Sequence, residues 1–202
     1  MKLYELKVED EGIDEVYAIS LVETPAIESD WIYLNKEELT FAKIDNEQRI
    51  LVGAILIPDK KILRVDGEGN PYHVFFSKET VKKLAQNYLM KKYNDSATFE
   101  HNKKIKGVHL VESWIKEGKL DKSNRYGLNL ADGTWVGIMK VTDDKIWNDY
   151  VKAGRVKGFS VEALLESKLV KASQEIDLER NIEDLDENEA NILPGQIKAI
   201  IK

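Results

Sequence analysis

The sequence predicts a mainly β protein in which two helices accompany mostly antiparallel strands. Short runs of β-branched and apolar residues recur along the chain, as in residues 15–22 (EVYAISLV) and 50–57 (ILVGAILI). Turn-forming residues separate these runs, and apolar residues follow clear helical spacing after Ser77 and after Thr142. This pattern favours an α+β domain built on antiparallel sheets.

The N-terminal half consists of predicted strands. Apolar and polar residues alternate over residues 3–8, and the run at 15–22 ends before Pro25, which cannot donate a ladder hydrogen bond. The run at 50–57 is almost entirely apolar, which is typical of a strand buried on both faces. Two further runs flank the turn sequence GEGNP and predict a hairpin at residues 61–65 and 72–76.

Both predicted helices have recognisable ends. Ser77 is a favourable N-cap for the first helix, and Thr80 follows three residues later. The acidic pair Asp143 and Asp144 predicts the start of the second, because carboxylates stabilise the positive end of a helix. Gly154 predicts its end. The remaining apolar runs predict strands at residues 97–100, 107–116, 134–141 and 157–165.

The strand pattern weakens after Glu166, so we divide the chain into a domain at residues 1–170 and a tail at residues 171–202. Within the tail, residues 181–191 (NIEDLDENEAN) are acidic and lack aromatic residues. Such a segment buries too little apolar surface to order itself. We therefore expect an acidic, disordered tail.

Composition excludes several classes of function. The net charge of −6 and the isoelectric point near 5.3 argue against a nucleic-acid partner. The absence of cysteine excludes disulfides and thiolate metal sites and is compatible with a reducing cytoplasm. We find no signal peptide, no apolar run long enough for a membrane span, and no metal or cofactor motif. The expectation is a soluble, intracellular protein without cofactor or metal.

The candidate chemistry rests on a serine and a histidine. A covalent hydrolase without cysteine needs an activated hydroxyl group and a base, and that base is most often histidine. Ser160 lies in the predicted strand GFSVE, where alternation places Glu162 on the same face. His101 follows the predicted strand at 97–100. The other two histidines, His73 and His109, lie within predicted strands and are typical of ordinary strand residues.

Seven ordered segments of the chain resemble the phage prohead (capsid maturation) serine proteases of the XkdF-like branch. They are VYAISLVETPA (16–26), VGAILIPDKKILR (52–64), PYHVFFS (71–77), His101, VESWI (111–115), GTWVGIMKV (133–141) and GFSVE (158–162). The resemblance implies a closed, mostly antiparallel β-barrel of the herpesvirus assemblin type with surrounding helices. It also implies that His101 and Ser160 form the catalytic pair.

The same resemblance implies the substrates and the cellular setting. Such an endopeptidase cleaves the scaffolding protein, the major capsid protein and itself, inside the assembling procapsid in the host cytoplasm. Self-cleavage is also compatible with a homo-oligomer. Neither a nucleic acid nor a membrane is an expected partner.

One departure from the family pattern leaves the third catalytic residue open. In many prohead proteases, a segment similar to residues 17–26 follows the serine strand and carries a glutamate that orients the histidine. Here this segment lies near the N-terminus, as in a circular permutation, and Ala18 occupies the glutamate position. Glu162 is the first candidate for the missing acid. The alternatives are Glu112, a second histidine (His109 or His73), or a dyad without a third member.

A competing interpretation is a protein without enzymatic activity. The missing acid at position 18 would fit a capsid-assembly or portal-associated structural protein with a decayed site, whereas the presence of both His101 and Ser160 favours the protease. A barrel that binds a small ligand is disfavoured, because its apolar strand faces are needed for the core.

Overall fold

The computed structural model describes residues 2–8, 14–24, 32–34 and 48–169. The predicted tail at residues 171–202 lies outside this range, as does Pro25. The division of the chain at residue 170 therefore stays a prediction.

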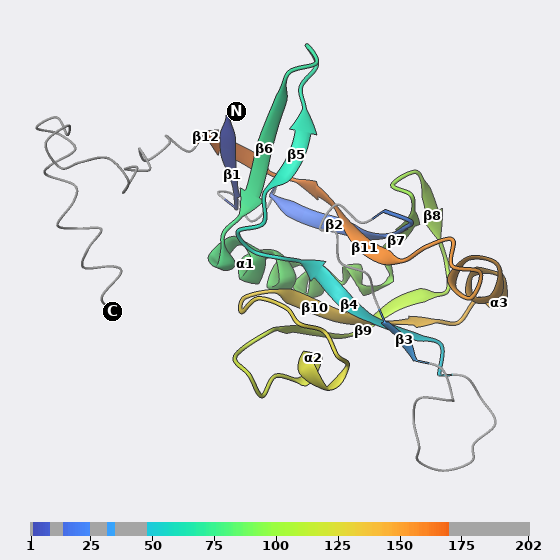
Figure 1. Ribbon diagram of the computed structural model, residues 1–202. Helices are drawn as coiled ribbons and strands as arrows, with labels where there is room; N and C mark the ends of the chain where they lie inside the picture. The colour runs from blue at the N-terminus through green and yellow to red at the C-terminus, as the bar shows by residue number, and fades with distance from the viewer. Residues whose placement is uncertain (1, 9–13, 25–31, 35–47, 170–202) are drawn as a thin grey trace, which may run out of the picture. The chain divides into compact units, whose positions relative to one another are not determined.

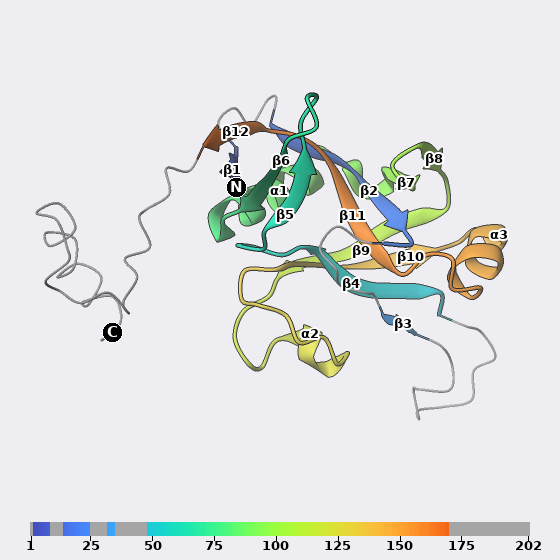
Figure 2. The same ribbon diagram turned by 45° about the horizontal axis from the view of Figure 1, so that its top comes forward.

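The described strands form three four-stranded sheets (Figures 1 and 2). The first has the order β12 (Glu166–Leu169), β1 (Leu3–Lys7), β6 (Pro71–Phe76), β5 (Ile62–Val65). The second has the order β3 (Ile32–Leu34), β4 (Ile50–Leu56), β10 (Trp135–Val141), β9 (Val108–Ile115). The third has the order β11 (Gly158–Leu164), β2 (Glu15–Val22), β7 (Ala97–Phe99), β8 (Lys103–Ile105).

The predicted closed barrel is wrong. A barrel requires each strand to pair on both sides, but each of the three sheets in the described part of the chain ends in two strands that pair on one side only. The chain instead leaves one sheet and enters another, as where β11 pairs with β2 and the following β12 pairs with β1. The mainly β character is confirmed, and among the described strand pairs only β1–β6 and β2–β7 are parallel.

The helices of the described residues are few and mostly short. The first predicted helix is α1 (Lys78–Met90), in which the Ser77 side chain accepts a hydrogen bond from the Thr80 backbone N–H at 3.4 Å. Its buried face packs Tyr88 against Trp135 of β10, with ring centroids 5.5 Å apart. The second predicted helix is a short α-helical turn followed by a π-helical turn, α3 (Asp144–Ile146) and η2 (Trp147–Val151). The other helical turns are η1 (Tyr93–Asp95) and α2 (Lys122–Arg125).

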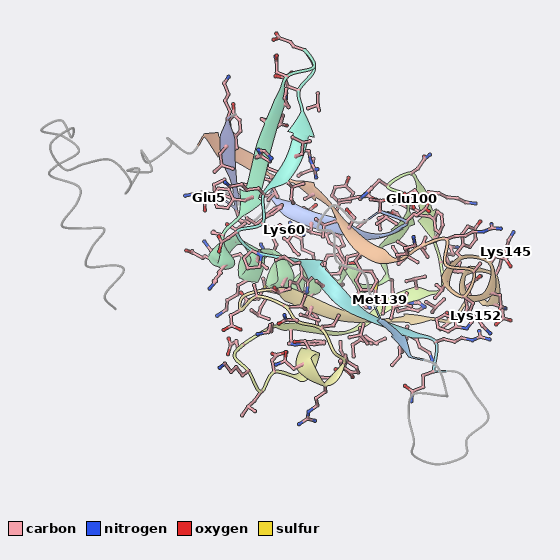
Figure 3. All side chains as sticks on the ribbon, in the orientation of Figure 1. Glu5, Lys60, Glu100, Met139, Lys145 and Lys152 are labelled. Carbon is pink, nitrogen blue, oxygen red and sulfur yellow. The ribbon has the colours of Figure 1, made fainter. Side chains whose placement is uncertain are left out.

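The main core contains residues from all three sheets and from α1. Its fully buried side chains include Ile19 and Phe159 of the third sheet and Leu51 and Met139 of the second (Met139 is labelled in Figure 3). Gly137 of β10 allows this close packing, because a Cβ atom there would lie 2.5 Å from Ile55 Cδ1. One face of the third sheet is therefore anchored, and its other face carries the candidate site.

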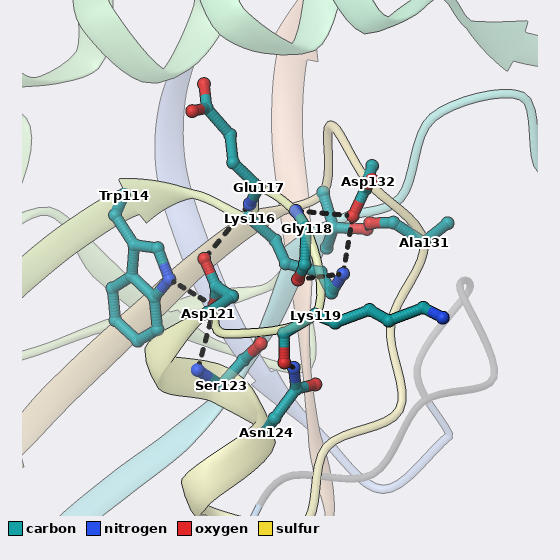
Figure 4. A network of polar contacts seen from close by, with 11 residues as sticks. Trp114, Lys116, Glu117, Gly118, Lys119, Asp121, Ser123, Asn124, Ala131 and Asp132 are labelled. Atoms are coloured by element: carbon teal, nitrogen blue, oxygen red, sulfur yellow. Dashed lines mark hydrogen bonds and ion pairs between the residues drawn. The ribbon is translucent and has the colours of Figure 1, made fainter.

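The connection between β9 and β10 is held by two aspartates (Figure 4). Asp121 accepts hydrogen bonds from Trp114 Nε1 at 3.1 Å and from the backbone N–H groups of Glu117 and Ser123 at 3.0 and 2.8 Å. Asp132 accepts from the largely buried Lys116 ammonium at 2.5 Å. Burial disfavours the Asp121 carboxylate, but these hydrogen bonds outweigh that effect and lower the pKa of Asp121 to about 2.

This depressed pKa predicts an acid-sensitive contribution to stability. The unfolded chain should titrate Asp121 near its ordinary value of 3.8, so the stabilisation is complete above that pH and is lost as the pH falls through about 2. In urea unfolding, the difference in unfolding free energy between the parent and Asp121→Asn should therefore shrink from pH 6 to pH 2. Asn124→Ala, an uncharged change in the same loop, should lower the unfolding free energy by the same amount at pH 6 and at pH 2. A difference for Asp121→Asn that is constant with pH would contradict this prediction.

Candidate active site

The site is built on one face of three adjacent strands, β11, β2 and β7, which lie side by side in Figures 1 and 2. Ser160 is the register partner of Ser20, and Ser20 is the partner of Thr98. Because register partners face the same side of a sheet, the three hydroxyl groups form a row across it. Their residues are almost fully buried, and Ser160, at 7 %, is the most exposed of them. Two strand spacings separate Ser160 from Thr98, about 10 Å between their Cα atoms.

Glu162 lies on the same face, two residues beyond Ser160, and its register partner on β2 is Ala18. Its Oε1 atom nevertheless accepts a hydrogen bond from the Thr98 hydroxyl on β7, the strand beyond β2. The Glu162 side chain therefore passes over β2 at Ala18, where a methyl group leaves room for it.

His101 lies in the turn between β7 and β8, where both Glu100 and His101 have positive φ angles, 47° and 55°. This left-handed conformation is unfavourable for side chains with a Cβ atom, so the surroundings must hold it. The His101 backbone N–H donates to the Ser20 hydroxyl at 3.0 Å, and the Glu100 carboxylate accepts from the Glu23 backbone N–H at 2.7 Å. The turn is in this way tied to β2 and to the residue that follows it, through Glu100 and through the backbone of His101.

The imidazole of His101 points toward Glu162. The distance from His101 Nδ1 to Glu162 Oε1 is 3.6 Å, slightly beyond hydrogen-bond length. The Glu162 side chain is 14 % exposed and the His101 side chain 43 %. The structure therefore brings together His101 and Glu162 from the predicted set, with Ser160 on the same strand and face as Glu162.

A β-bulge adds Tyr17 to the side chains around Glu162. The partner of Glu162 is Ala18 and the partner of Ala163 is Val16, so Tyr17 has no register partner on β11. Burial, the nearby Glu162 carboxylate and a hydrogen bond to that carboxylate together raise the pKa of Tyr17. Tyr17 and Thr98 therefore both hold Glu162. Sequence reasoning missed them, along with Ser20, because their roles depend on which strands pair and in which register.

The alternative third residues have partners of their own. Glu112 pairs with Lys122 at the surface of β9. His109 places Nδ1 at 2.6 Å from Asp95 Oδ1 and Nε2 at 3.4 Å from the Thr142 hydroxyl. His73 lies on β6 between Leu3 and Leu63 in register. No contact of the described residues joins any of the three to His101 or Ser160.

An apolar cavity lies behind the serine strand, on the face of β11 opposite the Ser160 side chain. Ser160 lines this cavity of about 240 Å³, whose other lining residues, apart from Arg64, are aliphatic or aromatic. Its walls come from β4, β5, β6 and β11, including Ile55, Val74 and Val161. Across the described residues there is no cluster of histidine and carboxylate side chains that could hold a metal ion. None of the helices in that part of the chain is long and apolar enough to cross a membrane.

Comparison with known proteins assigns the chain to a family. No curated protein and no solved structure matches it. The model of the family described as "Putative phage serine protease XkdF" matches residues 38–168, a range that contains His101, Ser160 and Glu162. Because the match covers well over half of the chain, this protein belongs to that family.

Proposed function

We propose that this protein is a serine endopeptidase in which Ser160 is the nucleophile, His101 the general base and Glu162 the residue that orients the histidine. The observation that carries the proposal is the single sheet face on which Ser160 and Glu162 lie, with His101 Nδ1 3.6 Å from the Glu162 carboxylate. A nucleophile, a base and a group that orients the base are the three parts of an activated hydroxyl.

The arrangement suggests how the proton moves. With Nδ1 directed to Glu162, the Nε2 atom of His101 is the nitrogen left to accept the proton of the Ser160 hydroxyl. Ser160 Oγ then attacks the scissile carbonyl, and His101 later returns the proton to the leaving amine. The negative charge of Glu162 stabilises the imidazolium formed between these steps.

The position of Glu162 supports a triad in which the acid that orients the histidine comes from β11 and not from β2. If the chain is a circular permutation of the prohead-protease order, its N-terminal segment supplies β2 without the usual glutamate. Ala18 then provides the space through which Glu162 reaches the histidine turn. The acid would thus come from the serine strand itself.

We propose that the substrates are phage proteins of the assembling procapsid: the scaffolding protein, the major capsid protein and the protease itself. Membership of a phage serine protease family supports a phage substrate. On this proposal, the enzyme acts in the host cytoplasm inside the procapsid, and the acidic tail is a candidate site of self-cleavage.

A fluorophosphonate probe tests the proposed nucleophile. The probe should label the purified full-length protein at one residue, and mass spectrometry of the labelled peptide should identify Ser160. Prior alkylation of histidine should slow this labelling, since the serine depends on its base. A label on Ser20, or no label on folded protein, would overturn the assignment.

A structural capsid protein without activity is the second candidate, and the low exposure of Ser160, 7 %, favours it. The mass of the protein after expression separates the two. An active enzyme should lose part of its tail in the parent and keep it in Ser160→Ala, whereas a structural protein should have the full mass in both.

A further inference from the structure

A second hollow, of about 280 Å³, lies beside the hairpin that carries His101. One wall comes from β7, β8 and the residues after them, and the other comes from α3 and η2. Both views of the ribbon show β8 and α3 at the same end of the molecule, and Figure 3 labels Glu100 and Lys145 there. One of its walls is therefore the hairpin that holds the proposed base.

Four lysines line this hollow: Lys103, Lys104, Lys106 and Lys145. Among the described residues, none of the four has an ion-pair partner within 4.0 Å. The one acidic lining residue is Asp143, whose carboxylate accepts the backbone N–H of Ile146 at 2.8 Å. The hollow is thus strongly positive in a protein whose net charge is −6.

The floor of the hollow is apolar and aromatic. Phe99 and Tyr150 meet edge to face with ring centroids 4.5 Å apart, and Ile105 and Ile146 complete the surface. The guanidinium of Arg155, which does not line the hollow, lies 5.8 Å from the centre of the Tyr150 ring. A ligand that fits must therefore combine negative charge with apolar side chains.

The two walls are fixed against each other at Gly107. Its φ angle is +78°, and a Cβ atom there would lie 2.9 Å from Asp143 Cβ, so the chains cross more closely than any other residue would allow. The backbone N–H of Thr142 donates to the Gly107 carbonyl at 2.7 Å at this crossing. The lysines of the β8 segment and Lys145 are consequently held on opposite sides of a preformed hollow.

We propose that this hollow binds a segment of the peptide substrate in which aspartate or glutamate residues flank an apolar side chain. The proposal rests on the proposed peptidase function. Phe99 and Lys103 each lie two residues from His101 in the sequence, so a segment bound here contacts the hairpin that carries the proposed base, on the face of β7 opposite Thr98. Charge complementarity favours the acidic peptide, and the apolar floor together with the net negative charge disfavours nucleic acid.

Fluorescence anisotropy with labelled peptides tests this proposal in the full chain carrying Ser160→Ala, which prevents cleavage. The probes are the peptide DLEDLDE and its neutral counterpart NLQNLNQ. At low salt, the acidic peptide should bind at least roughly tenfold more tightly than the neutral one, and 0.5 M NaCl should remove most of the difference. Lys103→Glu/Lys104→Glu should weaken binding of the acidic peptide by a similar factor.

The matched control is Lys82→Glu/Lys119→Glu, which makes the same change in charge at exposed sites outside the hollow and should leave affinity within about twofold. Should the first double variant fail to fold, Lys145→Ala on the opposite wall should weaken binding. Equal affinity for both peptides would overturn the proposal. An equal loss of affinity for the acidic peptide in the control variant would also overturn it. So would tighter binding of a single-stranded DNA probe than of the acidic peptide. Because binding is measured without Ser160, these outcomes are independent of whether the protein cleaves.

Discussion

Replacing Ser160 by alanine is expected to reduce peptide cleavage by about 10⁴- to 10⁶-fold, because the variant lacks the oxygen that would form the acyl-enzyme. His101→Ala should cause a loss of similar size. The double variant should lose little more than either single one, since the serine and its base act as a unit. The measurement is kcat/KM on a scaffold-derived or self-cleavage peptide, with each variant shown to unfold at the temperature of the parent.

Ser20→Ala is the informative control for this prediction. Ser20 lies in the same row as Ser160 and accepts the His101 backbone N–H, but it is fully buried. Its loss should reduce the rate by loosening the histidine turn and should leave the fluorophosphonate label on Ser160. If Ser20→Ala removes the label while Ser160→Ala keeps it, the roles of the two serines are reversed and the proposed triad is wrong.

Local patterns allowed most of the longer elements and one face of the site to be predicted, but not the short strands β3, β8 and β12. The alternation of a strand places Ser160 and Glu162 on one side, and β11 (Gly158–Leu164) has that geometry. The helix after Ser77 follows from a cap and an apolar repeat, both of which lie within a few residues of sequence. The expected strand at 107–116 is likewise observed as β9 (Val108–Ile115).

What could not be predicted depends on long-range register. The closed barrel was an implication of family resemblance, and three separate sheets replace it. The sequence carries no signal that β2 lies between β11 and β7, although this pairing alone lets Glu162 reach Thr98. The turn at Glu100 and His101 was equally hidden, because left-handed backbone usually occurs at glycine or asparagine and neither residue is present there.

The same reasoning explains why Tyr17 and Thr98 were overlooked. An isolated strand pattern assigns Tyr17 to the face opposite Ala18, and only the bulge against β11 changes its surroundings. Thr98 reads as an ordinary β-branched strand residue until its register partner is known. Residues that position a catalytic group are thus harder to find from sequence than the group itself.

Glu162→Gln is expected to lower kcat by about 10³- to 10⁴-fold with little change in KM, because the amide keeps the shape of the carboxylate but loses its charge. The neutral amide cannot stabilise the imidazolium and can hold the wrong tautomer of His101, as in triads whose acid is replaced by its amide. Glu112→Gln is the matched control, since Glu112 pairs with Lys122 on β9 and should leave kcat within about twofold. An equal loss in Glu112→Gln would contradict the assignment of Glu162.

Thr98 separates a positioning role from a merely structural one. Thr98→Val keeps the β-branched shape and removes the hydroxyl that donates to Glu162, so kcat should fall by roughly tenfold, in line with the loss of one hydrogen bond to a charged group. Thr98→Ser restores the hydroxyl and should recover most of that rate, even though it packs less well against β2. In the Glu162→Gln background, Thr98→Val should have almost no further effect, because the carboxylate through which it acts is gone. Independent losses in the double variant would mean that Thr98 supports the strand and not the acid.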